Sequence, residues 1–304
     1  KFNLNYSRDV FITEKEFIMP VANAISFDTE VVQHAPDLYD YAAEVPTIDG
    51  FDSVTDDDLA RYQEQGVIAI RNAWIKEEVQ SALAGLDHLI AGNEPAFQNI
   101  QFRADVRDRL ETLTFDERLD AARRLLYFTD YDARLKAIAH KPQLLALLER
   151  LLGAPARLFQ DMALIKPPNG REKPWHQGHA YFELTPETRV VGLWIALDPA
   201  GIENGCMRVM PGKHRDRKYH HFQIRDLQIC DSEMEGLQEH RVAVPLEPGG
   251  CLIFDSYIPH GTPSNFTSSR RRALQFHYHA VGAQRITAEE RVAIWGGEAN
   301  NVAC

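Results

Sequence analysis

The fold is decided by a series of short β-rich segments after Gly153, which begins with RLFQDMALIK (157–166) and VVGLWIAL (190–197). Turns rich in Gly, Pro and Asn separate the segments. The series continues with CMRVMPG (206–212), RVAVPL (241–246), CLIFD (251–255) and RALQFHYHA (272–280). Strands of this length and spacing are typical of an all-β sandwich or barrel. We therefore predict a jelly roll over residues 154–282.

The residues before this series favour helices. Acidic residues follow Ser53 and Thr55, as at a helix amino terminus, and Gly66 marks the end of that helix. Further segments with helical character lie at 76–91, 104–127 and 143–152, and VIAI (67–70) is a short strand. We predict one mainly β domain with α-helices over residues 1–304, made of an arm (1–50), mostly helical support (51–153), the β core (154–282) and a tail (283–304).

Composition excludes several classes of protein. The 33 basic and 44 acidic residues give a formal net charge of −11, which argues against binding to duplex nucleic acid. The apolar run at 190–197 is far shorter than the ~20 residues of a membrane-spanning helix. The amino terminus lacks a hydrophobic signal core, and the four cysteines form no CxxC pair, so we expect free thiols in a cytoplasmic protein. Small molecules are the expected partners, and the sequence does not indicate an oligomeric state.

Two histidines and one arginine carry the chemistry. His176 lies in KPWHQGHAYFE (173–183), and His260 ends DSYIPHG (255–261), at positions that a β-barrel can bring together. Imidazole is a good ligand for iron, copper, nickel or zinc. Arg271 follows His260 by 11 residues. Its guanidinium can bind a carboxylate through two hydrogen bonds.

These motifs occur in an order that resembles the phytanoyl-CoA dioxygenase family of non-haem iron(II), 2-oxoglutarate-dependent oxygenases. The resemblance covers about residues 55–280 and is carried by IKPP, WHQ, NGCMRVMPGKH, PHG and RRAL. It implies a double-stranded β-helix (a cupin-like jelly roll) with Fe(II), 2-oxoglutarate and O2 as cofactors. By resemblance, the iron ligands are His176 and His260, and the residues for 2-oxoglutarate are Arg271, Thr262, Trp194 and Met162.

One position departs from the family pattern. The family has an iron-binding Asp two residues after the first histidine, where this chain has Gly178. Residues i and i+2 of an extended segment face the same side, so the third ligand should originate at position 178. His179 and Glu183 lie at odd offsets from His176 and should point away on a regular strand, whereas a distorted turn would allow one of them to replace the ligand. We therefore expect a metal held by two histidines with one additional open position.

A charge count favours a small anion in that position. Iron(II) with dianionic 2-oxoglutarate and Asp carries one net negative charge, and chloride in place of Asp leaves the total unchanged. A neutral gap beside a cation favours an anion. Two-histidine sites with Gly or Ala here resemble the iron/2-oxoglutarate halogenases, which implies chlorination of an aliphatic carbon of a small metabolite. The alternatives are a hydroxylase with a natural or engineered Asp-to-Gly change, and a non-catalytic relative.

Two further groups have open interpretations. The basic stretch GKHRDRKYHH (212–221) is either a solvated loop or, through Lys213 and Arg215, a site for an anionic group of the substrate. Arg208 has the residue type for the same role. His277 and His279 would share one strand face, and they are candidates either for metal binding or for lining a pocket.

Overall fold

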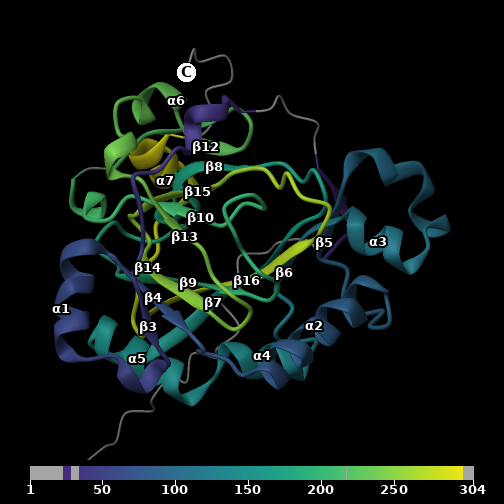
Figure 1. Cartoon of the computed structure of the whole chain (residues 1–304), viewed down its shortest axis with the longest axis horizontal. Coiled ribbons are helices and arrows are strands. Elements are labelled where there is room, and N and C mark those ends of the chain that lie inside the picture. The colour runs from purple at the N-terminus through teal and green to yellow at the C-terminus, as the bar shows by residue number, and fades with distance from the viewer. Residues whose placement is uncertain (1–22, 29–33, 217, 297–304) are drawn as a thin grey trace, which may run out of the picture.

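The computed structural model describes residues 23–28, 34–216 and 218–296, and consists mainly of two β-sheets that face each other (Figure 1). The larger sheet has nine strands with antiparallel pairing through its centre. Its strand order is β1 (Ser26–Phe27), β5 (Ile100–Phe102), β6 (Ala122–Leu126), β7 (Ala156–Lys166), β16 (Arg271–Ala280), β9 (Val190–Ala196), β14 (Cys251–Asp255), β4 (Val67–Arg71) and β3 (Thr47–Asp49).

The smaller sheet has five strands and closes over the inner face of the larger one. Its order is β2 (Ala43–Glu44), β13 (Val242–Val244), β10 (Met207–Val209), β15 (Pro259–Thr262) and β8 (Lys173–Gln177), and β11 (His221–Gln223) pairs separately with β12 (Leu227–Ile229). Trp194 and Phe254 of the larger sheet share one buried cluster with Met207 and Val209 of the smaller. The predicted class, mainly β with α-helices, is confirmed.

Helices cover the outer face of the nine-stranded sheet (Figure 1). Leu86 and Leu148 pack into one buried cluster with Phe276 and Tyr278 of β16. The helices on this side include α1 (Asp56–Gln65), α2 (Lys76–Ile90), α4 (Ala133–Ala139) and α5 (Pro142–Leu152), with α3 (Phe115–Ala121) at the edge of the sheet, whereas α6 (Asp231–Met234) and α7 (Ala288–Trp295) lie near β8 and β12 (Figure 1). In the described part of the chain, no helix has the length and apolarity needed to cross a bilayer.

The predicted helix boundaries follow from local chemistry. Thr55 caps α1, because its side chain accepts a hydrogen bond from the Asp58 amide while the Asp58 carboxylate accepts one from the Thr55 amide. Gly66 and Gly153 end α1 and α5 in the left-handed conformation that glycine adopts without steric cost. The predictions of helices after Thr55 and over 143–152 are confirmed.

The helix predicted over 104–127 is wrong in its last part. Residues Ala104–Thr112 form a 3-10 helix and Phe115–Ala121 form α3, but residues 122–126 form strand β6. This strand is hydrogen-bonded to β5 on one side and to β7 on the other, so sheet pairing overrides a helical composition. The segments before residue 153 therefore supply helices and also strands. Five of these strands belong to the nine-stranded sheet (β1, β3, β4, β5 and β6), and one belongs to the five-stranded sheet (β2).

The cysteine prediction needs a correction. Cys206 and Cys251 are free and buried, as expected. Cys230 is disulfide-bonded, so the prediction of four free thiols is wrong, and Cys304 lies outside the described residues. Cysteine usage therefore gives no argument for a reducing compartment.

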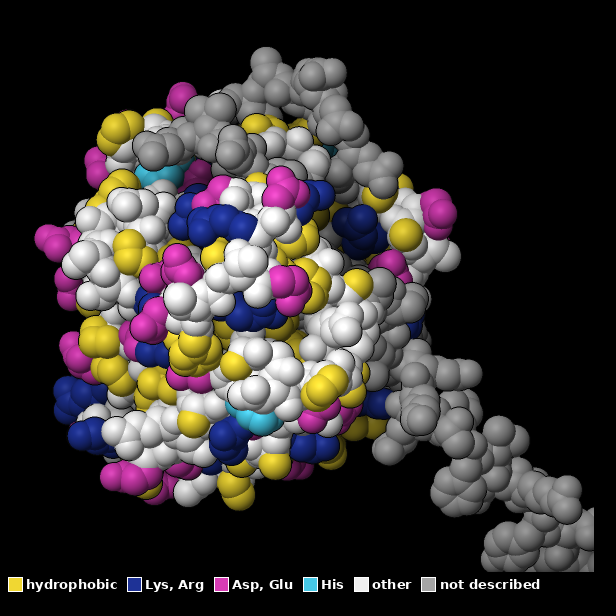
Figure 2. Space-filling view, turned by 90° about the vertical axis from the view of Figure 1, so that its right-hand side faces the viewer, with side chains coloured by type: hydrophobic (Ala, Val, Ile, Leu, Met, Phe, Trp, Pro, Cys, Tyr) yellow, Lys and Arg dark blue, Asp and Glu magenta, His cyan; other side chains and the backbone are white. Residues whose placement is uncertain are grey.

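The surface carries mixed charge. Figure 2 shows Lys and Arg side chains interspersed with Asp and Glu on the face that it presents. No continuous basic stripe is visible among the coloured residues of that face.

Candidate active site

His176 and His260 lie next to each other on neighbouring strands of the five-stranded sheet. Strands β8 and β15 are antiparallel, and the two histidines are direct cross-strand partners with ring centroids 4.1 Å apart. The His176 Nδ1 donates to the Pro174 carbonyl at 2.7 Å, and the His260 Nδ1 donates to the Ile258 carbonyl at 2.8 Å. Because a carbonyl only accepts, each Nδ1 carries the hydrogen and each Nε2 presents a lone pair, the arrangement that metal-binding histidines use.

Both imidazoles are buried and neutral. Burial, followed by the nearby His260 and Lys173, holds the pKa of His176 well below its usual range. Burial lowers the pKa of His260 to about 4. The His260 Nε2 is buried without a hydrogen-bond partner among the described residues. A divalent metal would satisfy this atom without first displacing a proton, so the pair fits a metal ion.

Gly178 leaves open space beside the two histidines. A Cβ at this position would lie 3.6 Å from the Ser256 carbonyl oxygen, 3.7 Å from the His260 Cε1 and 3.8 Å from the His277 Nε2, all ordinary contact distances. A methyl group would therefore fit. In the described residues, no group of three or more His, Cys, Asp or Glu side chains is placed to hold a metal. The protein thus offers two imidazoles and a gap.

The neighbouring polar residues do not fill the gap. The His179 imidazole is hydrogen-bonded to the Ser256 hydroxyl at 3.0 Å and to the Thr185 carbonyl at 3.1 Å, and its ring packs on Tyr257. Glu183 pairs with Arg285 at 3.4 Å. Neither residue lines the cavity that contains His176. Both point away from it, but not for the predicted reason, because Gly178–Tyr181 form a 3-10 helix and the alternation of an extended segment ends at Gln177.

Arg271 on β16 and Thr262 on β15, two residues after His260, form a polar wall of the cavity. Burial lowers the pKa of Arg271 to about 10, a value at which the guanidinium remains charged at neutral pH. Its Nε and Nη1 atoms and the Thr262 Oγ1 are buried and lack hydrogen-bond partners among the described residues. The Trp194 ring lies under the guanidinium, with the Arg271 Cζ 5.3 Å from its centroid. A carboxylate of 2-oxoglutarate would satisfy these orphaned donors, so the wall fits the cosubstrate.

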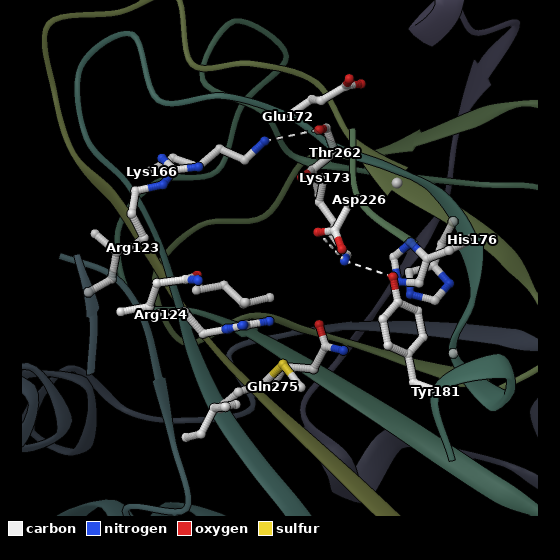
Figure 3. Close-up of a pocket in the computed structure, with 18 of the residues that line it drawn as sticks. Arg123, Arg124, Lys166, Glu172, Lys173, His176, Tyr181, Asp226, Thr262 and Gln275 are labelled. Carbon is white, nitrogen blue, oxygen red and sulfur yellow. Dashed lines mark hydrogen bonds and ion pairs between the residues drawn. The ribbon is translucent and has the colours of Figure 1, made fainter. Parts of the chain in front are cut away.

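A single cavity of about 220 Å³ connects this wall with the two histidines. Met162 lines the cavity, as the resemblance implies, whereas Trp194 is not among its lining residues and acts from behind Arg271. Figure 3 shows Arg123, Arg124 and Lys166 on one side and His176 and Tyr181 on the other. Its lining includes six basic side chains, Arg123, Arg124, Lys166, Arg171, Lys173 and Arg271, but only three acidic ones, Asp28, Glu172 and Asp226.

The residues predicted to recognise an anionic substrate lie elsewhere. Lys213 pairs with Asp216 at 2.8 Å, and Arg215 is exposed in the short 3-10 helix Lys213–Arg215. Arg208 is buried, where it donates to the Tyr39 carbonyl at 3.2 Å. None of the three lines the cavity that contains His176 and Arg271. The structure does not bring them to the candidate site.

The structure separates His277 from His279. His277 lines the main cavity, and its Nε2 lies 3.2 Å from the Gln275 side-chain amide. A register shift follows His277 in β16, and His279 stacks on Phe159 beside a second, smaller cavity. The two histidines thus line separate cavities, as in the pocket-lining alternative, while Phe159 packs against both rings, so they still share one face of β16 as predicted.

Arg124 and Tyr127 line the cavity and were not predicted from the sequence. Both lie in the segment that reads as a charged helix, and only the β-strand conformation of Ala122–Leu126 turns Arg124 into the cavity. An alternating pattern would have been the signal for a strand, and ARRLL does not show it.

Known proteins resemble this chain in sequence and in structure. A profile of the phytanoyl-CoA dioxygenase (PhyH) family matches residues 62–273. The peroxisomal phytanoyl-CoA dioxygenase of Mus musculus is 25% identical over 247 residues, covering 76% of this chain and 71% of that protein. A probable alpha-ketoglutarate-dependent hypophosphite dioxygenase of Stutzerimonas stutzeri is 24% identical over 234 residues, covering 73% and 77%.

Solved structures resemble the fold. EctD from S. alaskensis with bound Fe has a TM-score of 0.62 and 20% identity, covering 80% of each chain. EvdO2 from Micromonospora carbonacea var. aurantiaca complexed with 2-oxoglutarate has a TM-score of 0.59 and 21% identity, covering 77% of this chain and 94% of that one. The predicted double-stranded β-helix is confirmed.

Proposed function

Because the chain belongs to the phytanoyl-CoA dioxygenase family of iron(II)/2-oxoglutarate oxygenases, we propose that it is a halogenase of this type, which places chlorine on an aliphatic carbon of a small molecule. The observation that carries the proposal is the gap at Gly178 beside two ligand-ready imidazoles. A family member of the ordinary kind would present a carboxylate there.

The chain's own residues divide the task. His176 and His260 would hold the iron through Nε2, with their rings fixed by backbone carbonyls. Arg271 and Thr262 would bind the distal carboxylate of 2-oxoglutarate, and burial on the Trp194 ring keeps water from competing. When bound, iron and 2-oxoglutarate supply the oxidising power from O2. The protein supplies orientation, a dry cavity and the vacant coordination position.

Charge supports chloride as the occupant of that position. The nearest groups to a Cβ at position 178 are a backbone carbonyl and two imidazoles, so no carboxylate balances the metal there. The cavity as a whole has more basic than acidic side chains. An anion in the gap restores the charge that an aspartate would contribute.

The hydroxylase alternative has an observation of its own. All contacts of a Cβ at position 178 are 3.6 Å or longer, so the first side-chain atom of an aspartate would not displace a neighbour. A site that retains room for its lost ligand is compatible with an Asp-to-Gly change in a hydroxylase. In that case Gly178→Asp should create strong hydroxylation, whereas in a halogenase it should end halogenation.

An anaerobic halide titration tests the proposal without knowledge of the substrate. The Fe(II)- and 2-oxoglutarate-loaded protein is titrated with chloride or bromide while the visible absorption of iron-bound 2-oxoglutarate is followed. We expect a saturable shift in the wild type and in Gly178→Ala, because a methyl group meets only ordinary contacts. Gly178→Asp should show no shift, since its carboxylate fills the position. Absence of a saturable shift in the wild type would refute the halogenase.

A further inference from the structure

We infer that Arg124 binds an anionic group of the substrate, a carboxylate or a phosphate. The inference rests on the proposed function, because it takes His176 and His260 as the reacting end of the cavity and Arg271 as the cosubstrate end. It adds a substrate class and a recognition residue that neither the motifs nor the basic stretch at 212–221 pointed to.

The strand register places Arg124 on the cavity side of the nine-stranded sheet. Arg124 on β6 is the direct partner of Leu164 on β7, and Leu164 is the partner of Ala273 on β16. Ala273 lies two residues from Arg271 and two from Gln275, both of which line the cavity. Because cross-strand partners share a face, Arg124 points to the same side as these residues. Arg124 and Leu164 are themselves lining residues.

The carboxylates that line the cavity form their ion pairs with residues other than Arg124, and Asp226 interacts with the charge of Arg124 only at longer range. Asp28 pairs with Arg171 at 2.7 Å and with Arg123 at 3.5 Å. The other two carboxylates of the lining are also taken: Asp226 pairs with Lys173 at 2.6 Å, and Glu172 pairs with Arg225. Arg124 has no ion pair among the described residues, and its Nε is buried without a hydrogen-bond partner. A buried guanidinium donor without a partner is costly, and a bound anion would remove that cost.

Arg124 is separate from the cosubstrate site. Strand β7 lies between β6 and β16, so two strand spacings, about 10 Å, separate the backbones that carry Arg124 and Arg271. The cavity floor on the intervening strand includes Leu164, the partner of Arg124, and Lys166, the partner of Arg271, and Leu126 and Met162 extend its apolar part. The arrangement fits a molecule with an anionic end on Arg124 and an aliphatic body over this floor.

The end of β6 is held rigidly. Tyr127 follows the strand with a φ of 56°, a left-handed conformation that is uncommon for residues other than glycine. The Asp161 carboxylate braces this bend, because it accepts from the Phe128 amide at 2.6 Å and from the Thr129 hydroxyl at 2.8 Å. Strained backbone of this kind is retained where the surrounding structure fixes it, often at ligand sites. Tyr127 lines the cavity as a result.

Calorimetry with simple probes tests the inference. The anaerobic protein is loaded with Fe(II) and saturating 2-oxoglutarate, so that Arg271 is occupied, and is titrated with pentanoate, pentyl phosphate or the neutral pentanamide. We expect at least one anionic probe to bind more tightly than pentanamide. Arg124→Gln should weaken that probe by about 10- to 100-fold, the range for a hydrogen bond to a charged group, and should leave pentanamide unchanged. Arg124→Lys should lose less, and the more strongly affected of the two anions identifies the substrate class.

Two matched arginine variants complete the design. Arg103→Gln removes an exposed arginine that pairs with Asp105 at 2.9 Å and should leave probe binding unchanged. Arg215→Gln tests the basic stretch at 212–221 as the rival site. Failure of every anionic probe to bind the wild type, equal binding by Arg124→Gln, or loss only in Arg215→Gln would each overturn the inference.

The outcome is distinguishable from failure of the halogenase proposal. Arg124-dependent anion binding in a protein that shows no halide shift would refute the halogenase and support the anion site. A halide shift without Arg124-dependent binding would do the reverse.

Discussion

The two sheets present opposite kinds of chemistry to the same cavity. The five-stranded sheet presents two neutral imidazoles, His176 and His260. The residue that follows β8 near them, Gly178, has no side chain to bind a metal. The nine-stranded sheet presents Arg124, Lys166 and Arg271, of which Arg124 and Arg271 have buried nitrogens without partners. On the proposed function, the two guanidinium groups would bind a dicarboxylate and a charged substrate, and the position beside Gly178 would bind a halide.

The largest expected effect is the loss of Fe(II) binding when one of the two proposed iron ligands on the five-stranded sheet is removed. His176→Ala or His260→Ala should abolish Fe(II) binding, because the proposed site has only these two ligands among the described residues. His179→Ala is the matched control, since this buried histidine bonds to Ser256 and Thr185 outside the cavity. Iron content after anaerobic loading and desalting measures the difference. Equal iron in His176→Ala and His179→Ala would contradict the assignment.

The second largest expected effect is on 2-oxoglutarate binding, when the buried guanidinium of Arg271 on the nine-stranded sheet is removed. Arg271→Gln should weaken 2-oxoglutarate binding by about 100-fold, the scale for truncating one partner of a buried charge pair. Arg272→Gln is the matched control, because its neighbouring guanidinium pairs with Asp198 at 2.8 Å and is not part of the cavity lining. Calorimetry with 2-oxoglutarate should separate the two variants, and similar losses in both would place the cosubstrate elsewhere.

Asp161 should make the bend after β6 sensitive to pH. Burial raises the pKa of Asp161 to about 6, so the folded state binds its proton more tightly than the unfolded state. This contribution to stability is full below about pH 4 and is lost as pH rises through about 6, to an extent of about 3 kcal/mol. Urea unfolding at pH 4 to 7 should show the wild type losing stability relative to Asp161→Asn as pH rises. If the stability of the wild type relative to Asp161→Asn stayed constant or increased as pH rises, the raised pKa of Asp161 would be contradicted.

The smallest effect should come from the hydroxyl beside Arg271. Thr262→Val removes a buried donor and preserves shape, so 2-oxoglutarate affinity should fall by about 10-fold, as expected for one hydrogen bond to a charged group. Thr262→Ser retains the hydroxyl and should stay close to wild type. If valine binds the cosubstrate as tightly as threonine does, Thr262 makes no contact with the carboxylate.

The parts of this site that the sequence predicted are those with local signals. Strands β7, β9, β14 and β16 are bounded by turn residues, and His176, His260 and Arg271 occur in recognisable short motifs. The gap at Gly178 was visible because the expected ligand lies two residues from His176.

The remaining features depend on contacts between distant segments. Strand β6 has a helix-like composition and becomes a strand through pairing with β5 and β7, which is why Arg124 was missed. The basic composition of the stretch that contains Lys213 and Arg215 is apparent in the sequence. The sequence does not indicate, however, whether these side chains point into the cavity or away from it. The register shift after His277 likewise arises only when β16 pairs with β7.

Anomalous diffraction from crystals grown anaerobically with Fe(II), 2-oxoglutarate and bromide tests the central claim most directly. The account predicts a bromide peak at coordinating distance from the iron, on the side of Gly178, which disappears in Gly178→Asp crystals under the same conditions. A water molecule or a protein atom in that coordination position at saturating bromide would contradict it.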